Sequence, residues 1–319
     1  MPPGDCPMKF QNFIFTAVVI IIFIFLLISP ANAVTSARSG LMLWFKVLLP
    51  TLLPFMIVSK LLIELNAISY LTFLFSSCFK KMFHLSKAGT FVLMTGFLCG
   101  YPMGAKLISE LYQHKQLSYE ESCYLLTFCN NLSPMFISSF LTVSCFDAPE
   151  LLPYVILIIY GTPILYALLT QPFFRKNTSL ESCVLPPSTT FKKPDFEIID
   201  TAIMDSFTQI TKLGGYVIMF SVISGMFLSF SFSAPTLAFL TGVTEITTGI
   251  NYITVQGFSL QMRFSISTPL CVFGGLSGLM QTYSMIKNSK LPFMPYLRAK
   301  LIQTGASYVL TVFFLHTIL

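Results

Sequence analysis

The sequence predicts an all-α polytopic membrane protein, built as an inverted repeat of broken helices with two re-entrant helical hairpins. Three observations predict this class. Of the 319 residues, 54% are hydrophobic and only 10% are charged, whereas soluble domains carry roughly 25% charged residues. Several apolar runs reach the roughly 20 residues that cross a bilayer. Interruptions rich in glycine, proline and polar residues occur in the same order in both halves of the chain.

Six apolar stretches are expected to span the membrane: 12–29, 41–64, 151–170, 205–230, 265–286 and 296–316. Two further stretches, 88–114 and 234–254, are apolar but interrupted. A helix over 119–145 starts at the capping box Ser118-x-x-Glu121 and breaks at "NNLSP", as 265–286 breaks at "GGLSG". Lys212 precedes Gly214-Gly215, which predict a further break and a hinge within 205–230.

The N-terminal segment 1–34 is expected to be a transmembrane helix. Its apolar run from Phe13 to Ile28 is followed by Ala31-Asn32-Ala33, a pattern like a signal-peptidase site. A secretory apolar core is usually about 7–15 residues long, so a retained helix is favoured and cleavage stays the alternative.

The interruptions indicate a duplicated unit. "FLCG" (Phe97 to Gly100) precedes "NNLSP" as "FLTG" (Phe239 to Gly242) precedes "GGLSG", at spacings of 32 positions (Gly100 to Leu132) and 34 positions (Gly242 to Leu276). Internal repeats of this kind are typical of secondary transporters. The predicted division is a first repeat over 35–170 with hairpin 88–114, a cytoplasmic linker over 171–200, and a second repeat over 201–319 with hairpin 234–254.

The placement of basic residues favours re-entrant hairpins. If 88–114 and 234–254 each enter and leave on one side, only Arg38 and Arg263 lie on the outer face. Cytoplasmic loops carry an excess of lysine and arginine, so the basic face is cytoplasmic and the two repeats are inverted. The residues on that face are Lys9, Lys80, Lys81, Lys87, Lys115, Arg175, Lys176, Lys192, Lys193, Lys287, Lys290, Arg298 and Lys300.

The stretch "GFLCGYPMGAK" (residues 96–106) predicts a binding site, because it breaks the backbone and buries a charge in an apolar region. Irregular backbone at membrane depth is tolerated where it is buried in protein or lines a wet cavity. The helix that restarts after Pro102 presents free amides that attract anions, and Lys106 lies in its first turn. The alternatives are that Lys106 extends to the surface or pairs with Glu110.

The other interruptions supply polar partners. Asn130 and Asn131 are expected to bind substrate, with helix–helix hydrogen bonding as the alternative. Glu245 is an intramembrane acid, which by default suggests function: it would carry a coupling proton, bind a cation or hold substrate, unless it pairs with Lys106. The full set of expected substrate-binding residues is Gly100, Tyr101, Pro102, Gly104, Lys106, Asn130, Asn131, Ser133, Thr244, Glu245, Thr248, Gly274, Gly275 and Ser277.

Several functions are not expected. No GxxxxGK[ST] phosphate loop is present, and the three histidines are widely separated, so neither ATP hydrolysis nor a metal site is predicted. No constellation indicates an enzyme or a cofactor. The +6 net charge is attributed to cytoplasmic loops, not to nucleic-acid binding. The eight cysteines contain no CxxC pair and are interpreted as small buried hydrophobes in a reducing compartment.

The string "GFLCGYPMGAKLISELY…LSYEESCYLLTFCNNLSPMFI" (Gly96 to Ile137), with "GVTEITTG" in the second half, resembles the YlbJ-type sporulation integral membrane proteins. These belong to the nucleoside-recognition (Gate) family, which is distantly similar to concentrative nucleoside transporters. The resemblance implies a protein of spore-forming Firmicutes, made in the mother cell. There it would help move dipicolinic acid across the outer forespore membrane, which derives from the mother cell's inner membrane.

Three functional hypotheses follow. The first is a secondary transporter of a small organic anion, with dipicolinic acid as the leading substrate. The second is a transporter of nucleosides or related metabolites, and the third is a non-transporting membrane scaffold for spore-envelope assembly. The expected partners are a small anionic metabolite, the lipid bilayer and a coupling ion, either a proton or sodium; a homo-oligomer is left open.

Overall fold

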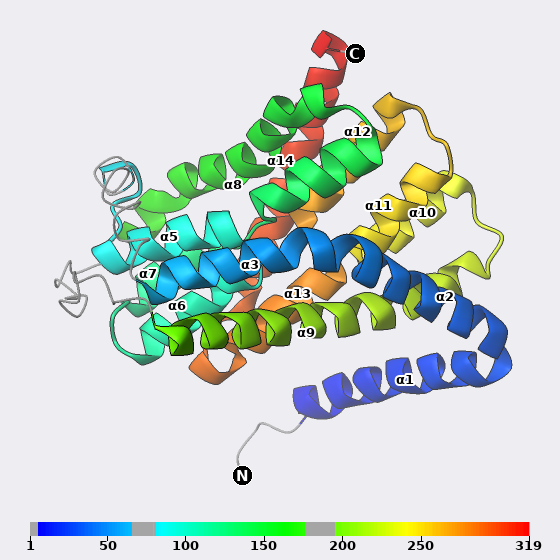
Figure 1. The fold of residues 1–319 in the computed structure, drawn as a ribbon, viewed down its shortest axis with the longest axis horizontal. Helices are drawn as coiled ribbons and strands as arrows, with labels where there is room; N and C mark the ends of the chain where they lie inside the picture. The colour runs from blue at the N-terminus through cyan, green and yellow to red at the C-terminus, as the bar shows by residue number, and fades with distance from the viewer. Residues whose placement is uncertain (1–5, 66–78, 80, 176–194, 319) are drawn as a thin grey trace.

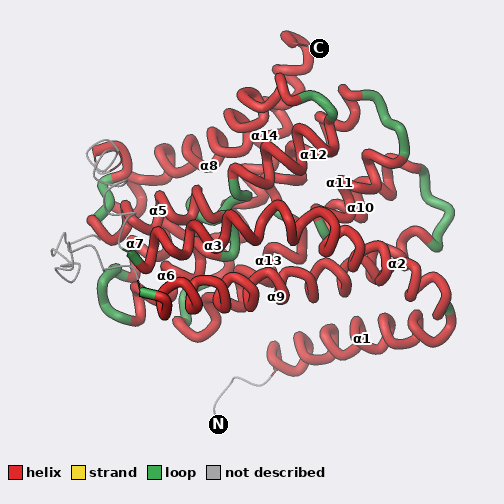
Figure 2. The backbone as a smooth tube through the Cα atoms, viewed as in Figure 1, coloured by secondary structure: helices red, strands yellow, loops and turns green. Residues whose placement is uncertain are grey.

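The computed structural model describes residues 6–65, 79, 81–175 and 195–318. Every regular element in these ranges is helical (Figure 2), so the predicted all-α class is confirmed for the described chain. Residues of the expected linker between 176 and 194, together with Lys80, lie outside the described residues.

The N-terminal helices are longer than predicted. The helix expected over 12–29 starts earlier, at Cys6. The helical stretch expected over 41–64 starts at Pro30, because proline is well suited to the first position of a helix. A bend of 108° separates the first helix from the second at Ser29. The elements are α1 (Cys6–Ile28), α2 (Pro30–Leu43), the π-helical η1 (Trp44–Leu48) and α3 (Leu49–Glu64).

The first interrupted stretch folds back on itself at Gly100. The two helices on either side of this turn pack against one another. The Cys129 carbonyl oxygen would lie 2.3 Å from a Cβ on Gly96 and 2.7 Å from one on Gly104, so only glycine fits at these two positions. The elements of this half are α5 (Lys87–Cys99), α6 (Met103–Gln113), α7 (Tyr119–Phe128), the π-helical η2 (Phe136–Phe146), η3 (Pro149–Leu151) and α8 (Leu152–Arg175).

In the second half, a long helix is followed by two short helices, a divided helix and a second long helix. The interrupted stretch of this half turns at Glu245, and a Cβ on Gly249 would lie 2.2 Å from the Cα of Gly242 across the hairpin. A break at Gly274 (φ +83°) divides the expected helix over 265–286. The elements are α9 (Phe196–Leu228), α10 (Ala234–Thr244), α11 (Ile246–Val255), α12 (Leu260–Phe273), α13 (Gly275–Ile286), η4 (Lys287–Ser289) and α14 (Phe293–Ile318).

The break expected at Gly214-Gly215 is wrong, since α9 continues through both glycines. A Cβ on Gly214 would lie 2.7 Å from the Trp44 indole, whereas nothing lies within 4 Å of one on Gly215. The Trp44 Nε1 also donates to the Ile210 carbonyl oxygen at 2.8 Å. Gly214 therefore serves helix packing between η1 and α9, not a hinge.

The capping box at Ser118 is half formed. The Ser118 hydroxyl accepts from the Glu121 amide at 3.1 Å, as expected. The Glu121 carboxylate instead accepts from the amide of Ser86 at 2.7 Å, just before α5. Glu121 therefore ties the start of α7 to the start of α5.

The two hairpins point toward the middle of the molecule from opposite ends (Figure 1). The pair α5–α6 lies at one end, together with the start of α7 and the end of α8. The pair α10–α11 lies at the other end, together with the start of α12. Lys87 begins α5, Lys115 follows α6 and Arg175 ends α8, so basic residues gather at the first of these ends.

Two helices are long and apolar enough to cross a membrane alone: Pro149–Phe174 and Phe196–Leu228, within α8 with η3 and α9. The bent pair Thr16–Ile28 and Pro30–Lys46 adds a third span if it is counted as one. The other expected spans over the described residues are divided into shorter helices or carry charges. Large hydrophobic side chains such as Ile28 (76% exposed) and Val309 (67% exposed) lie on the outer surface, as lipid contact requires.

Candidate functional site

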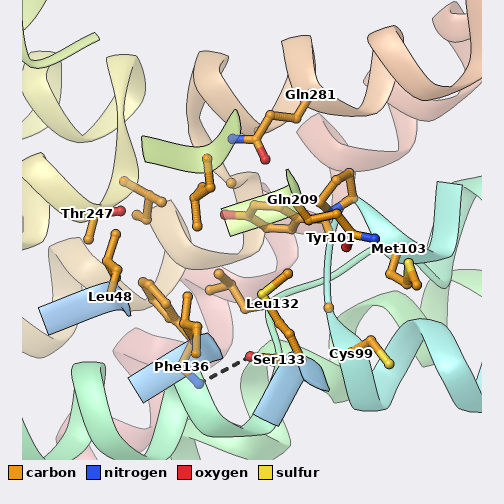
Figure 3. Close-up of a pocket in the computed structure, with 18 of the residues that line it drawn as sticks. Leu48, Cys99, Tyr101, Met103, Leu132, Ser133, Phe136, Gln209, Thr247 and Gln281 are labelled. Atoms are coloured by element: carbon orange, nitrogen blue, oxygen red, sulfur yellow. Dashed lines mark hydrogen bonds between the residues drawn. The ribbon is translucent and has the colours of Figure 1, made fainter. Parts of the chain in front are cut away.

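A pocket that is partly open to the outside lies where the two hairpin tips meet (Figure 3). Its wall is mainly apolar, from residues such as Leu48, Leu132 and Phe136. Polar groups converge on it from both halves of the chain. The polar and charged side chains of its lining are Lys60, Tyr101, Ser133, Ser206, Gln209, Glu245, Thr247, Ser277 and Gln281.

Four helices begin at this pocket. The lining includes Pro102, which precedes α6, and Ser133, which precedes the helix leading into η2. It also includes Glu245 and Gly274, which precede α11 and α13. The first amides of a helix have no partner within it, and they carry a partial positive charge. The pocket therefore concentrates the positive ends of several helices.

The first hairpin tip rests on the "NNLSP" break. The Tyr101 amide donates to the Asn131 carbonyl oxygen at 2.7 Å. A Cβ on Gly100 (φ +75°) would lie 2.7 Å from the Ser133 amide nitrogen, so this close approach requires glycine. The Ser133 hydroxyl accepts from the Phe136 amide at 3.2 Å and so caps the next helix (Figure 3).

The second tip rests on the "GGLSG" break in the same way. A Cβ on Gly275 (φ +70°) would lie 3.2 Å from the Ile246 amide nitrogen at the start of α11. The Glu245 side chain caps α11: it accepts from the amides of Thr247 (3.1 Å) and Thr248 (2.6 Å) and from the Thr247 hydroxyl (2.8 Å). A carboxylate is stabilised at this positive helix end, which explains an acid that is only 2% exposed in an apolar segment.

Tyr101 joins the two tips. Its ring extends across the pocket toward the side that carries Thr247 (Figure 3), and its atoms lie 3.3 Å from the Cβ position of Gly278 and 3.5 Å from that of Gly274. The Tyr101 hydroxyl is buried and has no hydrogen-bond partner within the described chain. A buried hydroxyl without a partner is costly, so this group is available to a bound ligand.

An ion pair between α3 and α9, which belong to neither hairpin, places its lysine in the pocket wall. The Lys60 Nζ on α3 lies 2.9 Å from Asp205 Oδ2 on α9, with the Lys60 side chain 13% exposed. A lysine near a helix end can extend to the membrane surface, but Lys60 lines the pocket instead. Lys60 and Glu245 are the charged residues of the described lining.

The expected binding residues divide into two groups of equal size. Seven line the pocket: Gly100, Tyr101, Pro102, Ser133, Glu245, Gly274 and Ser277. The other seven lie outside its lining: Gly104, Lys106, Asn130, Asn131, Thr244, Thr248 and Gly275. Polar lining residues outside the expected set are Lys60, Ser206, Gln209, Thr247 and Gln281; for Lys60, a charge inside the apolar stretch 41–64 was an available signal.

Lys106 lies away from the pocket, with its side chain 29% exposed. Its Nζ is 3.8 Å from Glu110 Oε1, one helical turn on, which is the alternative that the sequence left open. The expected alternative for Glu245, a salt bridge with Lys106, is not formed, because Glu245 caps α11. Thr244 and Thr248 likewise bond locally, to the Leu240 carbonyl oxygen and the Ser221 hydroxyl.

Asn130 and Asn131 connect helices behind the pocket. The Asn130 Nδ2 donates to Thr282 Oγ1 (2.7 Å) and to the Tyr296 hydroxyl (3.2 Å). Asn130 Oδ1 accepts from the Ala105 amide at 3.4 Å. The Asn131 Oδ1 accepts from Lys300 at 2.9 Å. Both side chains thus make the helix–helix hydrogen bonds that the sequence left as an alternative.

The placement of Lys300 at the cytoplasmic surface is wrong, because the residue is 2% exposed. It lies on α14, which packs against α7, α8, α12 and α13. The sequence analysis began this helix at residue 296, only four residues before Lys300, so the sequence did not distinguish a buried lysine from one that extends to the surface. No group of three or more possible metal ligands (His, Cys, Asp or Glu) occurs among the described residues.

Comparison with known proteins adds two similarities to this geometry. Residues 45–169 match the family model described as nucleoside recognition (Gate). They run from η1 to α8 and so include the first hairpin and the "NNLSP" break. The chain is also 26% identical over 307 residues to the sporulation integral membrane protein YlbJ of Bacillus subtilis (strain 168), covering 86% of this chain and 75% of that protein.

The resemblance to the YlbJ-type sporulation integral membrane proteins is confirmed. The protein is an integral membrane protein, in agreement with the predicted localisation and with its apolar helices. No solved structure matches the chain.

Proposed function

We propose that this Gate-domain protein is a secondary transporter of a small organic anion, with dipicolinic acid across the outer forespore membrane as the leading candidate. The observation that carries the proposal is the meeting of four helix starts at one pocket, of which those of α6 and α13 have no side-chain cap, with Lys60 at its wall. Such helix starts attract anions. The likeness to a sporulation membrane protein supports the cellular setting.

The proposed transport route uses two re-entrant hairpins in an inverted repeat. The hairpins α5–α6 and α10–α11 reach the pocket from opposite ends (Figure 1). Many secondary transporters place their sites where broken helices meet, and move one repeat against the other. A planar aromatic dianion would place its ring against Tyr101 and the apolar wall, and its carboxylates toward the helix starts and Lys60.

The second candidate is a nucleoside or related neutral metabolite. It is favoured by the nucleoside-recognition description of the matched family and by two amides in the lining, Gln209 and Gln281. In this case the amides and the Tyr101 hydroxyl would recognise a base, and Lys60 would remain paired with Asp205.

The test is uptake by purified protein in liposomes, with labelled dipicolinate and labelled uridine compared with protein-free liposomes. Saturable uptake of dipicolinate is the expected result. Uptake of uridine alone would assign the second candidate. Absence of both would favour the scaffold function for spore-envelope assembly.

Substitutions at the ion pair separate an anion from a neutral substrate. Asp205→Asn removes the carboxylate beside Lys60, so we expect a several-fold lower KM for dipicolinate and no change for a neutral solute. Lys60→Gln should raise that KM, whereas Lys106→Ala, which lies outside the lining, should leave it within about twofold. Equal effects of Lys60→Gln and Lys106→Ala would contradict the assignment of Lys60 to the site.

A further inference from the structure

A second polar centre lies behind the pocket, around Lys300. This side chain is buried and is not part of the pocket lining. Its Nζ donates to Asn131 Oδ1 at 2.9 Å and to the Val272 carbonyl oxygen at 3.2 Å. Asn131 belongs to the "NNLSP" break and Val272 lies two residues before Gly274, so one ammonium group joins the breaks of both halves.

No acidic side chain of the described chain forms an ion pair with Lys300. The ion pairs of the described chain join Lys60 with Asp205 and Lys106 with Glu110, and neither includes Lys300. The last carbonyl groups of α12, Val272 among them, carry the negative end of that helix. The Tyr296 ring supplies a π face 5.9 Å from Nζ.

The surrounding groups hold these acceptors in place. The Asn131 Nδ2 donates to the Phe128 carbonyl oxygen at 2.7 Å, which turns Oδ1 toward Lys300. The Tyr296 hydroxyl is held by Asn130 at 3.2 Å. Three residues further along α14, Gln303 donates to the Thr127 carbonyl oxygen at 2.8 Å. Lys300 and Gln303 on α14 therefore both bond to residues in or just before the first break.

An amide oxygen and a carbonyl at the end of a broken helix are ligands that hold small monovalent cations in transporters. Here a lysine ammonium, which is also a monovalent cation, lies at that position. We propose that Lys300 is a tethered cation that replaces a free sodium or potassium ion at the junction of the two breaks. The consequence for transport, which rests on the proposed function, is that uptake requires neither ion.

The first test uses stability and needs no substrate. Lys300→Ala removes the ammonium and leaves its oxygen ligands, so a small cation should bind there and stabilise the fold by mass action. We expect the variant to melt below the wild type in choline chloride, and to gain about 3 °C or more in sodium, potassium or methylammonium chloride at equal ionic strength. The wild type should shift by less than about 1 °C between these salts.

Lys300→Met is the matched control, because its side chain fills the space and offers no vacancy for a cation. It should therefore show no such gain. The proposal fails if Lys300→Ala responds to all three cations no more than the wild type does, or if Lys300→Met gains as much as Lys300→Ala.

If Lys300→Ala does not fold, measurements on the wild-type protein test the proposal. A rise of several degrees in the wild-type melting temperature on replacing choline with sodium or potassium would overturn the proposal, and an unchanged value supports it. In liposomes, equal uptake with and without these ions is expected, and a strict requirement for either ion overturns the proposal. Absence of uptake in every salt would instead count against transport itself and would leave the stability results standing.

Discussion

Three charged residues in the apolar segments of the described chain have identifiable local partners. Glu245 caps α11, Lys106 pairs with Glu110, and Lys300 bonds to both helix breaks. From the sequence alone, Glu245 was correctly expected to be buried. Lys106 was also expected to be buried but is partly exposed, and Lys300 was expected at the surface but is buried. Which charge is buried depends on the face that each helix turns to its neighbours, and a single sequence does not give that face.

The cap at Glu245 gives the first prediction. Glu245→Ala removes the acceptor for the amides of Thr247 and Thr248, and loss of a helix cap costs about 0.5–2 kcal/mol. We expect a lower thermal midpoint, measured by the fluorescence of purified protein. Glu150→Ala, at an exposed position, is the control and should change the midpoint little. A Glu245→Ala midpoint as high as that of Glu150→Ala would show that the cap does not stabilise the fold.

Tyr101 gives the second prediction. Its hydroxyl has no partner among the described residues, so Tyr101→Phe should leave stability unchanged or slightly raised, because an unsatisfied buried polar group is removed. If the hydroxyl binds substrate, the KM for uptake should rise several-fold with little change in the melting temperature. Lower stability together with unchanged KM would assign the hydroxyl to the fold instead.

At the scale of elements, each hairpin closes through a pair of glycines. Gly96 and Gly104 both pack against the Cys129 carbonyl oxygen in the first, and Gly249 packs against Gly242 in the second. The sequence correctly predicted that the chain breaks at Gly100 and at Gly274, because glycine, proline and asparagine all disfavour a continuous helix there. It wrongly added a break at Gly214-Gly215, because the sequence does not distinguish a glycine that makes room for the Trp44 indole from a glycine that turns the chain.

The third prediction compares two glycines. Gly249→Ala places a Cβ 2.2 Å from backbone of the opposite helix, whereas nothing lies within 4 Å of a Cβ at Gly305. Overpacking typically costs about 1–3 kcal/mol, so Gly249→Ala should melt several degrees lower and transport poorly. Gly305→Ala should melt at or above the wild-type temperature, since alanine favours helix. Similar midpoints for both variants would contradict the tight closure of α10 on α11.

At the scale of the whole molecule, the all-helical class and the membrane localisation were predictable from composition and hydropathy. The pocket was predicted only in part, because its lining also includes Lys60 from α3 and Gln209 from α9. These helices reach the site through tertiary packing that no local pattern encodes. The inverted arrangement of the repeats stays a prediction, supported by the opposite directions of the two hairpins in Figure 1.

A labelling experiment tests that arrangement. His114, after α6, and Gln256, after α11, are both exposed and lie at the far ends of their hairpins. In a background without other reactive cysteines, His114→Cys and Gln256→Cys should react with a membrane-impermeant maleimide from opposite sides of the membrane. His114→Cys should react from the cytoplasmic side. Labelling of both from one side would rule out inversion.

Trp44 is the single tryptophan of the chain, and it is wedged between η1 and α9 at Gly214 and Ile210. Leu48, one turn further along η1, and Gln209, beside Ile210, both line the pocket. Trp44 therefore lies at the contact between η1 and α9, beside the pocket, where a bound ligand would change the surroundings of the indole. Tryptophan emission should follow substrate titration in unlabelled, unmodified protein.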